Sequence, residues 1–231
     1  MSRVKLEMTT TSYAVLGLLC VQPWTAYELT GQMRRSLRFF WPRAESGIYR
    51  EPQKLVDLGY ASATTVAAGP RRTKQQYAAT PAGRAALARW LRTPSAPPQF
   101  ESEAMVKFFF ADQGELADAQ QALDGLAAKA DALWDTLTTI VASHEHPAGP
   151  FPQRQHIGPL IGCFVLNYAA MLGQWAGWAR EHADQWPGTG PEAAPHGDQV
   201  QREFAEIAQH PRHHAHPVLP WPSSGPRPTG S

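Results

Sequence analysis

Apolar residues at helical and strand spacing, separated by capping and turn signals, predict three short helices, a hairpin and a fourth helix between Thr11 and Leu91. Hydroxyl residues Thr9–Ser12 precede the first helix, which is apolar nearly all round and therefore suits a central core position. Thr25 and Glu28 have the spacing of a capping box, which predicts the start of the second helix. This order of elements is that of a winged helix-turn-helix.

The third helix is predicted to begin at a Ser46 cap and to end at Gly59. Its inward side is apolar, and its other side groups aromatic, amide and cationic side chains. The inward residues are Ile48, Pro52 and Leu55, and the exposed residues are Tyr49, Arg50, Gln53 and Lys54. In a major groove, Arg and Gln can read base edges and Lys can neutralise phosphate. A solvated face of any amphipathic helix has the same composition, so this pattern alone supports both interpretations.

The predicted hairpin carries cations at its tip. Ala61–Val66 and Lys74–Ala79 alternate as strands, and the loop between them contains Arg71 and Arg72. With Lys74, these side chains can reach the phosphates that flank a groove or enter a narrow minor groove. The fourth helix is predicted to return three apolar residues to the core, namely Leu87, Trp90 and Leu91.

The second half of the chain has a different pattern. The Pro-rich residues 94–99 predict a stiff linker, after which a short apolar helix and two long helices with heptad seams follow. The first seam contains Leu116, Ala119, Leu123, Leu126, Ala130, Leu133, Leu137 and Ile140. The second seam contains Ile157, Ile161, Phe164, Tyr168, Met171, Trp175, Trp178 and His182. Helices with this much apolar surface need partners, so a C2 homodimer with two recognition helices is predicted.

Aromatic residues in this half allow two interpretations. Trp134, Tyr168, Trp175 and Trp178, together with Trp186, either fill the dimer core or line a flat pocket between subunits for a small aromatic effector.

Charge divides the chain at the same place. Residues 1–93 contain 14 Lys and Arg against 5 Asp and Glu, a net charge of +9, and residues 94–231 contain 7 against 15, a net charge of −8. A basic field confined to one small domain is typical of a protein that meets a phosphate backbone. The sequence contains no Gly-rich phosphate loop, zinc-spaced cysteine pair or nucleophile motif, so neither an enzyme nor a cofactor is predicted.

One segment raises the question of a membrane. Ile157–Ala179 runs 23 residues without a charge, a length that could span a bilayer. An asparagine, a glutamine, a proline and four glycines make it only moderately apolar, which favours a buried helix of a dimer core. Cys20 and Cys163 both lie in apolar runs, and the polar N-terminal residues lack a signal peptide, so a reducing cytoplasm is predicted.

The last part of the chain is rich in Pro, Gly, Ala and His from Pro187 onward, a composition that predicts disorder. Its histidines could bind a transition metal, but a solvated tail is favoured and no metal site is predicted; they are His210, His213, His214 and His216. The predicted organisation is a DNA-binding domain (1–93), a linker (94–99), a dimerization domain (100–186) and a disordered tail (187–231).

Several short strings resemble the PadR-like transcriptional regulators over about Thr11–Leu91 and more loosely to Trp186. They are Leu16-Gly17-Leu18-Leu19, Ala26-Tyr27-Glu28-Leu29, Ser46-Gly47-Ile48-Tyr49, Lys54-Leu55 with Leu58-Gly59-Tyr60, and Gln76-Tyr77 followed by Thr80-Pro81-Ala82-Gly83-Arg84. The resemblance implies a winged-helix repressor whose third helix enters the major groove, whose wing touches the backbone and whose C-terminal helices form a homodimer. It also implies that Tyr27 and Tyr49 sit at the DNA surface, and that some relatives bind planar drugs or phenolic acids.

Two further details concern the resemblance. Ser102-Glu103 followed by Phe108-Phe109 resembles the entry to the Vir-like C-terminal domain of one PadR subfamily. Pro52 departs from the family pattern, in which that position is apolar and not proline. A proline inside a regular helix costs roughly 3 kcal/mol, so the third helix is predicted to be kinked or to begin later than Ser46.

The sequence therefore predicts a mainly α protein, a winged helix-turn-helix domain followed by a long-helix dimerization domain. It is expected to bind double-stranded DNA in the cytoplasm as a homodimeric repressor that a small aromatic effector releases. The alternative is a winged helix used for protein-protein contact without DNA binding, which would not need a cationic wing. The predicted DNA-contacting residues are Tyr27, Ser46, Tyr49, Arg50, Gln53, Lys54, Arg71, Arg72 and Lys74.

Overall fold

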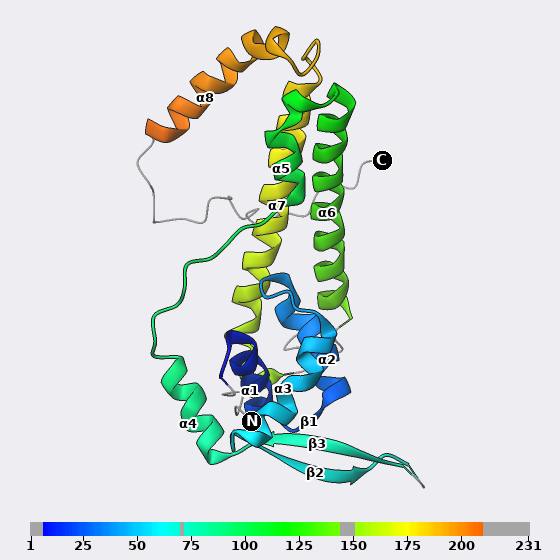
Figure 1. Cartoon of the computed structure of the whole chain (residues 1–231), viewed down its shortest axis with the longest axis vertical. Helices are drawn as coiled ribbons and strands as arrows, with labels where there is room; N and C mark the ends of the chain where they lie inside the picture. Colours follow the sequence, from blue (N-terminus) through cyan, green and yellow to red (C-terminus); the bar gives the residue numbers. More distant parts are fainter. Residues whose placement is uncertain (1–6, 70–71, 144–150, 210–231) are drawn as a thin grey trace, which may run out of the picture. The chain divides into compact units, whose positions relative to one another are not determined.

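The computed structural model describes residues 7–69, 72–143 and 151–209. The chain divides into two compact units, residues 1–99 and 100–231, and each is described by itself. Figure 1 labels the α-helices and strands of both units.

The first unit is a winged helix-turn-helix, as predicted. Its elements are α1 (Thr10–Val21), β1 (Trp24–Thr25), α2 (Ala26–Ser36), η1 (Leu37–Phe39), α3 (Glu45–Asp57), β2 (Ala61–Ala67), β3 (Thr73–Ala79) and α4 (Pro81–Trp90). The three strands form an antiparallel sheet in the order β1-β3-β2. The two-residue strand β1 was not predicted, because a strand this short leaves no alternating pattern to detect.

The caps of α1 and α2 explain where these helices begin. Thr9 caps α1 in a capping box with Ser12, and Thr25 caps α2 in the predicted box with Glu28. Behind these caps the large apolar residues of the unit are almost fully buried, a set that comprises Val15, Leu16, Leu19, Leu29, Met33 and Leu55. Burial of each such side chain contributes about 1.5–3 kcal/mol, so the unit has a closed core of its own.

The start of α3 differs from the prediction. The helix begins at Glu45 after Ala44, whose side chain makes no capping hydrogen bond, so Ser46 lies within the first turn and is not the cap. Pro52 lies inside the continuous helix α3 and is fully buried, so the helix does not begin later than predicted. The proline has no N–H to donate to the carbonyl of Ile48, and the apolar contacts of its buried ring offset part of that loss.

Two glycines shape the end of α3 and the packing of α4. Gly59 has φ +74°, the left-handed conformation predicted to end the helix. A Cβ on Gly83 would overlap the carbonyl oxygen of Tyr60, so only glycine lets α4 approach this closely. The prediction that Leu91 returns to the core is wrong, since that residue follows the end of the helix and is 68% exposed.

The second unit is a helical hairpin. Its elements are α5 (Glu103–Phe109), η2 (Ala111–Gln113), α6 (Leu116–Ala142), η3 (Pro152–Arg154), α7 (Gly158–Ala183), η4 (Pro191–His196) and α8 (Gly197–Gln209). Helices α6 and α7 run antiparallel, side by side, and pack along their lengths (Figure 1). The first predicted seam supplies the packing face of α6, where Ala119, Leu123, Leu126, Ala130 and Leu137 are buried.

The face of α7 that packs inside the chain is not the predicted seam. The buried residues are small, namely Val165, Ala169, Ala176, Ala179 and Ala183. The predicted seam residues Phe164 and Met171 are exposed instead, Phe164 by 60%. Close approach of two helices favours small side chains at the contact, so the alanine face packs and the bulky face is left outside.

The structure also differs from the predicted disorder after Pro187. Residues 191–209 form η4 and α8, and α8 places Val200 and Phe204 four positions apart, the spacing of one helix face. The four histidines of the predicted tail lie outside the described residues.

Candidate nucleic-acid interface

Helix α3 presents the predicted polar face. Ile48, Pro52 and Leu55 are buried, as predicted, and the opposite side exposes Tyr49, Arg50 and Gln53. The Gln53 amide donates a hydrogen bond to Asp57 Oδ1 at 3.0 Å. Ser46 is also exposed, one turn before Tyr49 and Arg50. The Tyr49 ring and the Arg50 guanidinium can approach base edges, and the Gln53 amide can do so through its carbonyl oxygen and its remaining N–H.

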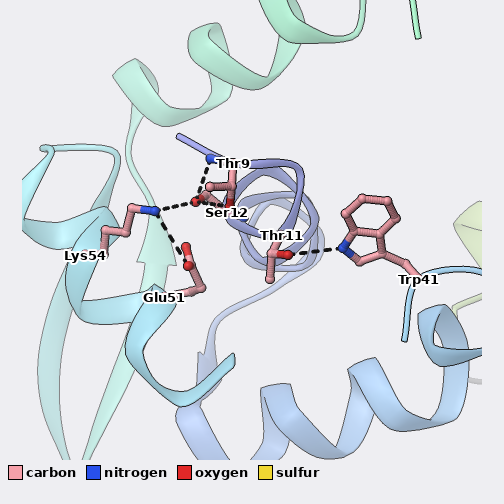
Figure 2. Close-up of polar contacts among 6 residues, drawn as sticks. All are labelled: Thr9, Thr11, Ser12, Trp41, Glu51 and Lys54. Atoms are coloured by element: carbon pink, nitrogen blue, oxygen red, sulfur yellow. Dashed lines mark hydrogen bonds and ion pairs between the residues drawn. The ribbon is translucent and has the colours of Figure 1, made fainter. Parts of the chain in front are cut away.

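Lys54 is half-buried, unlike Tyr49, Arg50 and Gln53, which are exposed. Its ammonium group donates to Ser12 Oγ at 2.9 Å and lies 3.6 Å from Glu51 Oε1. Only 18% of its side chain is exposed, and Figure 2 shows it directed toward α1. The contact joins residues 42 positions apart, so Lys54 ties α3 to the start of α1.

The first turn of α1 forms hydrogen bonds with two other segments of the unit. Ser12 is fully buried and exchanges capping bonds with Thr9, whose backbone N–H donates to Ser12 Oγ at 3.0 Å. Thr11, the residue before Ser12, accepts a 3.1 Å hydrogen bond from Trp41 Nε1. Trp41 and Lys54 approach α1 from opposite sides of the helix (Figure 2). Both α3 and the segment before it are therefore held by α1.

In the wing, two of the three predicted cations are described. The ladder closes at Ala67 and Thr73, so the turn is shorter than predicted, and Arg72 is exposed within it. Lys74 pairs with Glu28 Oε1 of α2 at 3.0 Å, across 46 positions of sequence. Arg71 lies outside the described residues.

The ion pair that Lys74 forms near the tip of the hairpin belongs to the capping box of α2. Glu28 accepts hydrogen bonds from the Thr25 backbone N–H at 2.9 Å, from the Thr25 hydroxyl at 2.8 Å and from Lys74. These bonds lower the pKa of the Glu28 carboxyl from 4.5 to about 2. Lys74 therefore fixes the hairpin to α2, and Tyr27, the neighbour of Glu28, stays 76% exposed on the first turn of that helix.

One group of candidate residues was missed in the sequence. Four arginines lie between positions 34 and 43, interleaved with Phe39, Phe40 and Trp41. Cations and aromatic rings alternating just before a recognition helix are a readable signal for nucleic-acid contact. Arg34 and Arg35 lie in the last turn of α2, and the rest of the pattern falls in a connection too short to show a periodicity.

The predicted effector residues occupy different environments. Trp175 packs edge-on against Phe108, with 6.1 Å between the ring centres. Both rings lie against a core cluster of Leu123, Ala179 and Ala183. Tyr168 is half-buried beside Phe100, and burial raises the pKa of its hydroxyl. Trp134 and Trp178 are exposed. Trp175 thus belongs to the core of the unit, while the other three remain accessible to some extent.

Two further observations concern metal ligands and membrane-crossing length. No group of three His, Cys, Asp or Glu side chains that could hold a metal ion occurs within residues 7–69, 72–143 and 151–209. In the same part of the chain α7 alone has the length and composition of a membrane-crossing helix, and its alanine face packs against α6.

Comparison with known proteins bears directly on the first unit. The model of the Transcriptional regulator PadR-like family matches residues 15–89. Negative transcriptional regulator PadR of Bacillus subtilis is 34% identical over 104 residues, and a probable transcriptional regulator of Mycobacterium tuberculosis, Rv1176c, is 38% identical over 85 residues. The winged-helix domain belongs to the PadR-like family.

The match to these PadR-like relatives is partial in length. It covers 45% and 37% of this chain and 57% and 45% of the two relatives, so the chain spans about half the length of the curated relatives it matches. Solved structures extend the likeness of fold. Bacillus subtilis PadR in complex with operator DNA aligns with a TM-score of 0.64 and 24% identity, over 76% of this chain and 99% of that chain. The same protein in complex with p-coumaric acid aligns with a TM-score of 0.59, over 77% and 100%.

Proposed function

We propose that this protein is a cytoplasmic transcriptional regulator that binds double-stranded DNA through its PadR-like domain. The observation that carries the proposal is the exposed face of α3, where Tyr49, Arg50 and Gln53 stand clear of the core in a domain of basic charge. In a helix-turn-helix protein the N-terminal residues of the recognition helix contact base edges. Both curated relatives are named as transcriptional regulators, which supports the same function.

The structure allows the predicted contacts to be divided by role. Arg50 and Gln53 are assigned to base edges, with Ser46, Tyr49 and Tyr27 beside them, and the exposed wing residue Arg72 to phosphate. Arg71 shares the wing assignment from sequence. Lys54 and Lys74 are assigned a positioning role, because each ammonium group is already bound by a carboxylate of the same domain.

We assign the outer face of α7 to a homodimer interface. A stripe of bulky apolar side chains, which includes Ile161, Phe164 and Met171, is exposed in the single chain. An exposed apolar stripe of this kind on a soluble helix marks an interaction surface. A two-fold partner would cover it with the same stripe and would present two copies of α3 to DNA.

The proposal includes repression of transcription and release from DNA by a small aromatic effector. One curated relative is named a negative regulator, and one solved neighbour was crystallised with p-coumaric acid. A planar ligand that enters beside Trp178, Trp134 and Tyr168 would change the distance between the subunits, and therefore between the recognition helices. Coupling must be reciprocal, so DNA should weaken ligand binding by the factor with which ligand weakens DNA binding.

The test of the function is selection of duplexes from a random library with the purified full-length protein. The expected result is an inverted repeat whose half-sites lie about 10 base pairs apart, one turn of the double helix. On that DNA, Arg50→Ala should relax discrimination at one base pair by about 1–3 kcal/mol, whereas Arg72→Ala should weaken all sequences alike. Absence of any enriched DNA would favour the winged helix as a protein-protein contact instead.

The effector is tested by titration of phenolic acids with and without the selected DNA. Quenching of tryptophan emission that Trp178→Phe reduces, and that DNA opposes, is the expected result. Quenching that neither Trp178→Phe nor DNA changes would contradict a ligand site beside Trp178. Absence of quenching by any phenolic acid would contradict the proposal of an aromatic effector.

A further inference from the structure

We propose that the segment between α2 and α3, residues 37–43, forms a second phosphate-binding surface in which Arg38 and Arg43 contact the DNA backbone. The proposal rests on the proposed function, since it adds a flanking contact to DNA held by α3 and the wing.

Both arginines are held over aromatic rings. The guanidinium carbon of Arg38 lies 5.0 Å from the centre of the Phe39 ring, and that of Arg43 lies 4.2 Å from the Trp41 ring. Both residues are exposed at the surface. A guanidinium stacked on a ring keeps its N–H edge free and loses less conformational entropy when that edge binds a phosphate.

The platform under Arg43 is anchored to the domain. Trp41 Nε1 donates to Thr11 Oγ1 at 3.1 Å (Figure 2). The Trp41 backbone N–H donates to the Leu37 carbonyl at 2.8 Å. Arg43 itself donates from Nη1 to the Pro42 carbonyl at 2.7 Å, which leaves its other N–H groups available. The cation is therefore preorganised on α1, the helix that also holds α3.

The acids near these two charges pair with other cations. The nearest acid in sequence, Glu45, pairs with Arg34 at 3.4 Å. Glu28 and Glu51 are paired with lysines. In the part of the chain that the structure describes, no carboxylate forms an ion pair with Arg38 or Arg43. Exposed cations without a partner in the fold attract phosphate.

The segment stands where phosphates are expected. Arg43 precedes the first residue of α3 by two positions, so their Cα atoms are at most about 7 Å apart. An α-helix with its side chains is about 10–12 Å across and a major groove is about 12 Å wide, so residues just outside the start of the helix meet the backbone that walls the groove. Such contacts carry no sequence information, but they fix the register of the helix.

The first experiment measures affinity against salt for the full-length double variant Arg38→Ala/Arg43→Ala, on both selected and random duplexes. Affinity should fall alike for the two DNAs, and the slope of log affinity against log salt should flatten by about 1.8, or 0.9 for each phosphate. The matched control Arg89→Ala/Arg92→Ala removes the same charge from exposed positions of the same domain, and it should keep the wild-type slope.

Each outcome is informative. Wild-type protein that binds no DNA would refute the proposed function itself. Wild-type binding with an unchanged slope in Arg38→Ala/Arg43→Ala would overturn only the second surface. If the control flattens the salt slope equally, the effect comes from net charge alone and the second surface is refuted. If affinity is lost only for the selected duplex, these arginines contact bases and not phosphates.

A double-mutant cycle tests the anchor. Thr11→Val keeps the shape of the side chain and removes the acceptor for Trp41, which should weaken DNA binding about threefold, the worth of one modest hydrogen bond. In an Arg43→Ala background the same change should have no effect, because it acts through Arg43. Equal losses in both backgrounds would overturn this role of the anchor.

Discussion

The two units bury their large apolar side chains to very different extents. In the first unit Leu16, Leu29 and Leu55 have no exposed surface. In the second, alanines make up most of the α7 face that packs on α6, and bulky residues such as Leu160 and Phe164 are exposed on the single chain. Because apolar surface left in water forfeits about 25 cal/mol per Å², the second unit would gain more than the first from a partner that covers its exposed apolar face.

The largest effect is expected from breaking the exposed stripe. Phe164→Asp places a carboxylate in the proposed interface, where an unpaired buried charge costs several kcal/mol, so dimer dissociation should become at least about a thousandfold easier. Sedimentation at micromolar concentration measures this. The control Gln121→Asp, at an exposed polar position of α6, should remain dimeric. A wild-type protein that sediments as a monomer would contradict the proposal that the exposed stripe of the second unit is a dimer interface.

A single glycine tests how tightly the first unit is closed. Gly83→Ala should destabilise the protein by about 3 kcal/mol, because the added methyl group would overlap the Tyr60 carbonyl, a backbone atom that cannot turn away. Gly125→Ala in α6 has open space around it, so better helix propensity should stabilise that helix by up to about 1 kcal/mol. Urea unfolding compares the two. The same sign of effect at both positions would contradict the difference in packing.

The ion pair that fixes the wing predicts a dependence on pH. The pKa of Glu28 is lowered from 4.5 to about 2, so its stabilisation is complete above pH 4.5 and is lost as the pH falls toward 2. The side chain is 41% exposed, so solvent screening reduces the effect to about 1 kcal/mol. Glu28→Gln should be less stable than wild type at pH 7, with a gap that closes below pH 4.5. A gap independent of pH would contradict this account.

The smallest effect concerns Pro52. Pro52→Leu restores an N–H that can donate to the Ile48 carbonyl, but the larger side chain must fit a buried site, so the net gain should be about 1 kcal/mol. The control Pro81→Ala, at the first position of α4 where no N–H is needed, should give no gain. If the proline aims Gln53, the same variant should melt at a higher temperature and bind DNA less well. A loss of stability would mean that the site has no room for leucine.

Much of the first unit could be predicted because its signals are local. The capping box of Thr25 and Glu28, the left-handed Gly59 and the inward face of α3 each depend on residues a few positions apart. The winged-helix order follows from them. The Ser46 cap was wrong because the chain enters α3 through Ala44, which makes no side-chain cap, so Ser46 falls within the first turn.

Whether each predicted cation stays exposed or pairs inside the domain depends on contacts between residues that are distant in sequence. Nothing near Lys54 in sequence indicates that Ser12 will meet it, and nothing near Lys74 indicates Glu28. Periodicity places a side chain on a face, but only the fold brings a second element against that face. Arg50 and Arg72 stay exposed because no acid is brought to them among the described residues.

In α7 the sequence by itself determined that the helix would be long and apolar on more than one side. It could not determine which side would meet α6, because the bulky seam and the alanine stripe are both apolar and lie one position apart. The tertiary structure decided in favour of the alanines, since two helix backbones approach most closely where side chains are small. Bulky seam residues such as Phe164 and Met171 were thereby left exposed, which is why the proposed homodimer interface lies on this face of α7.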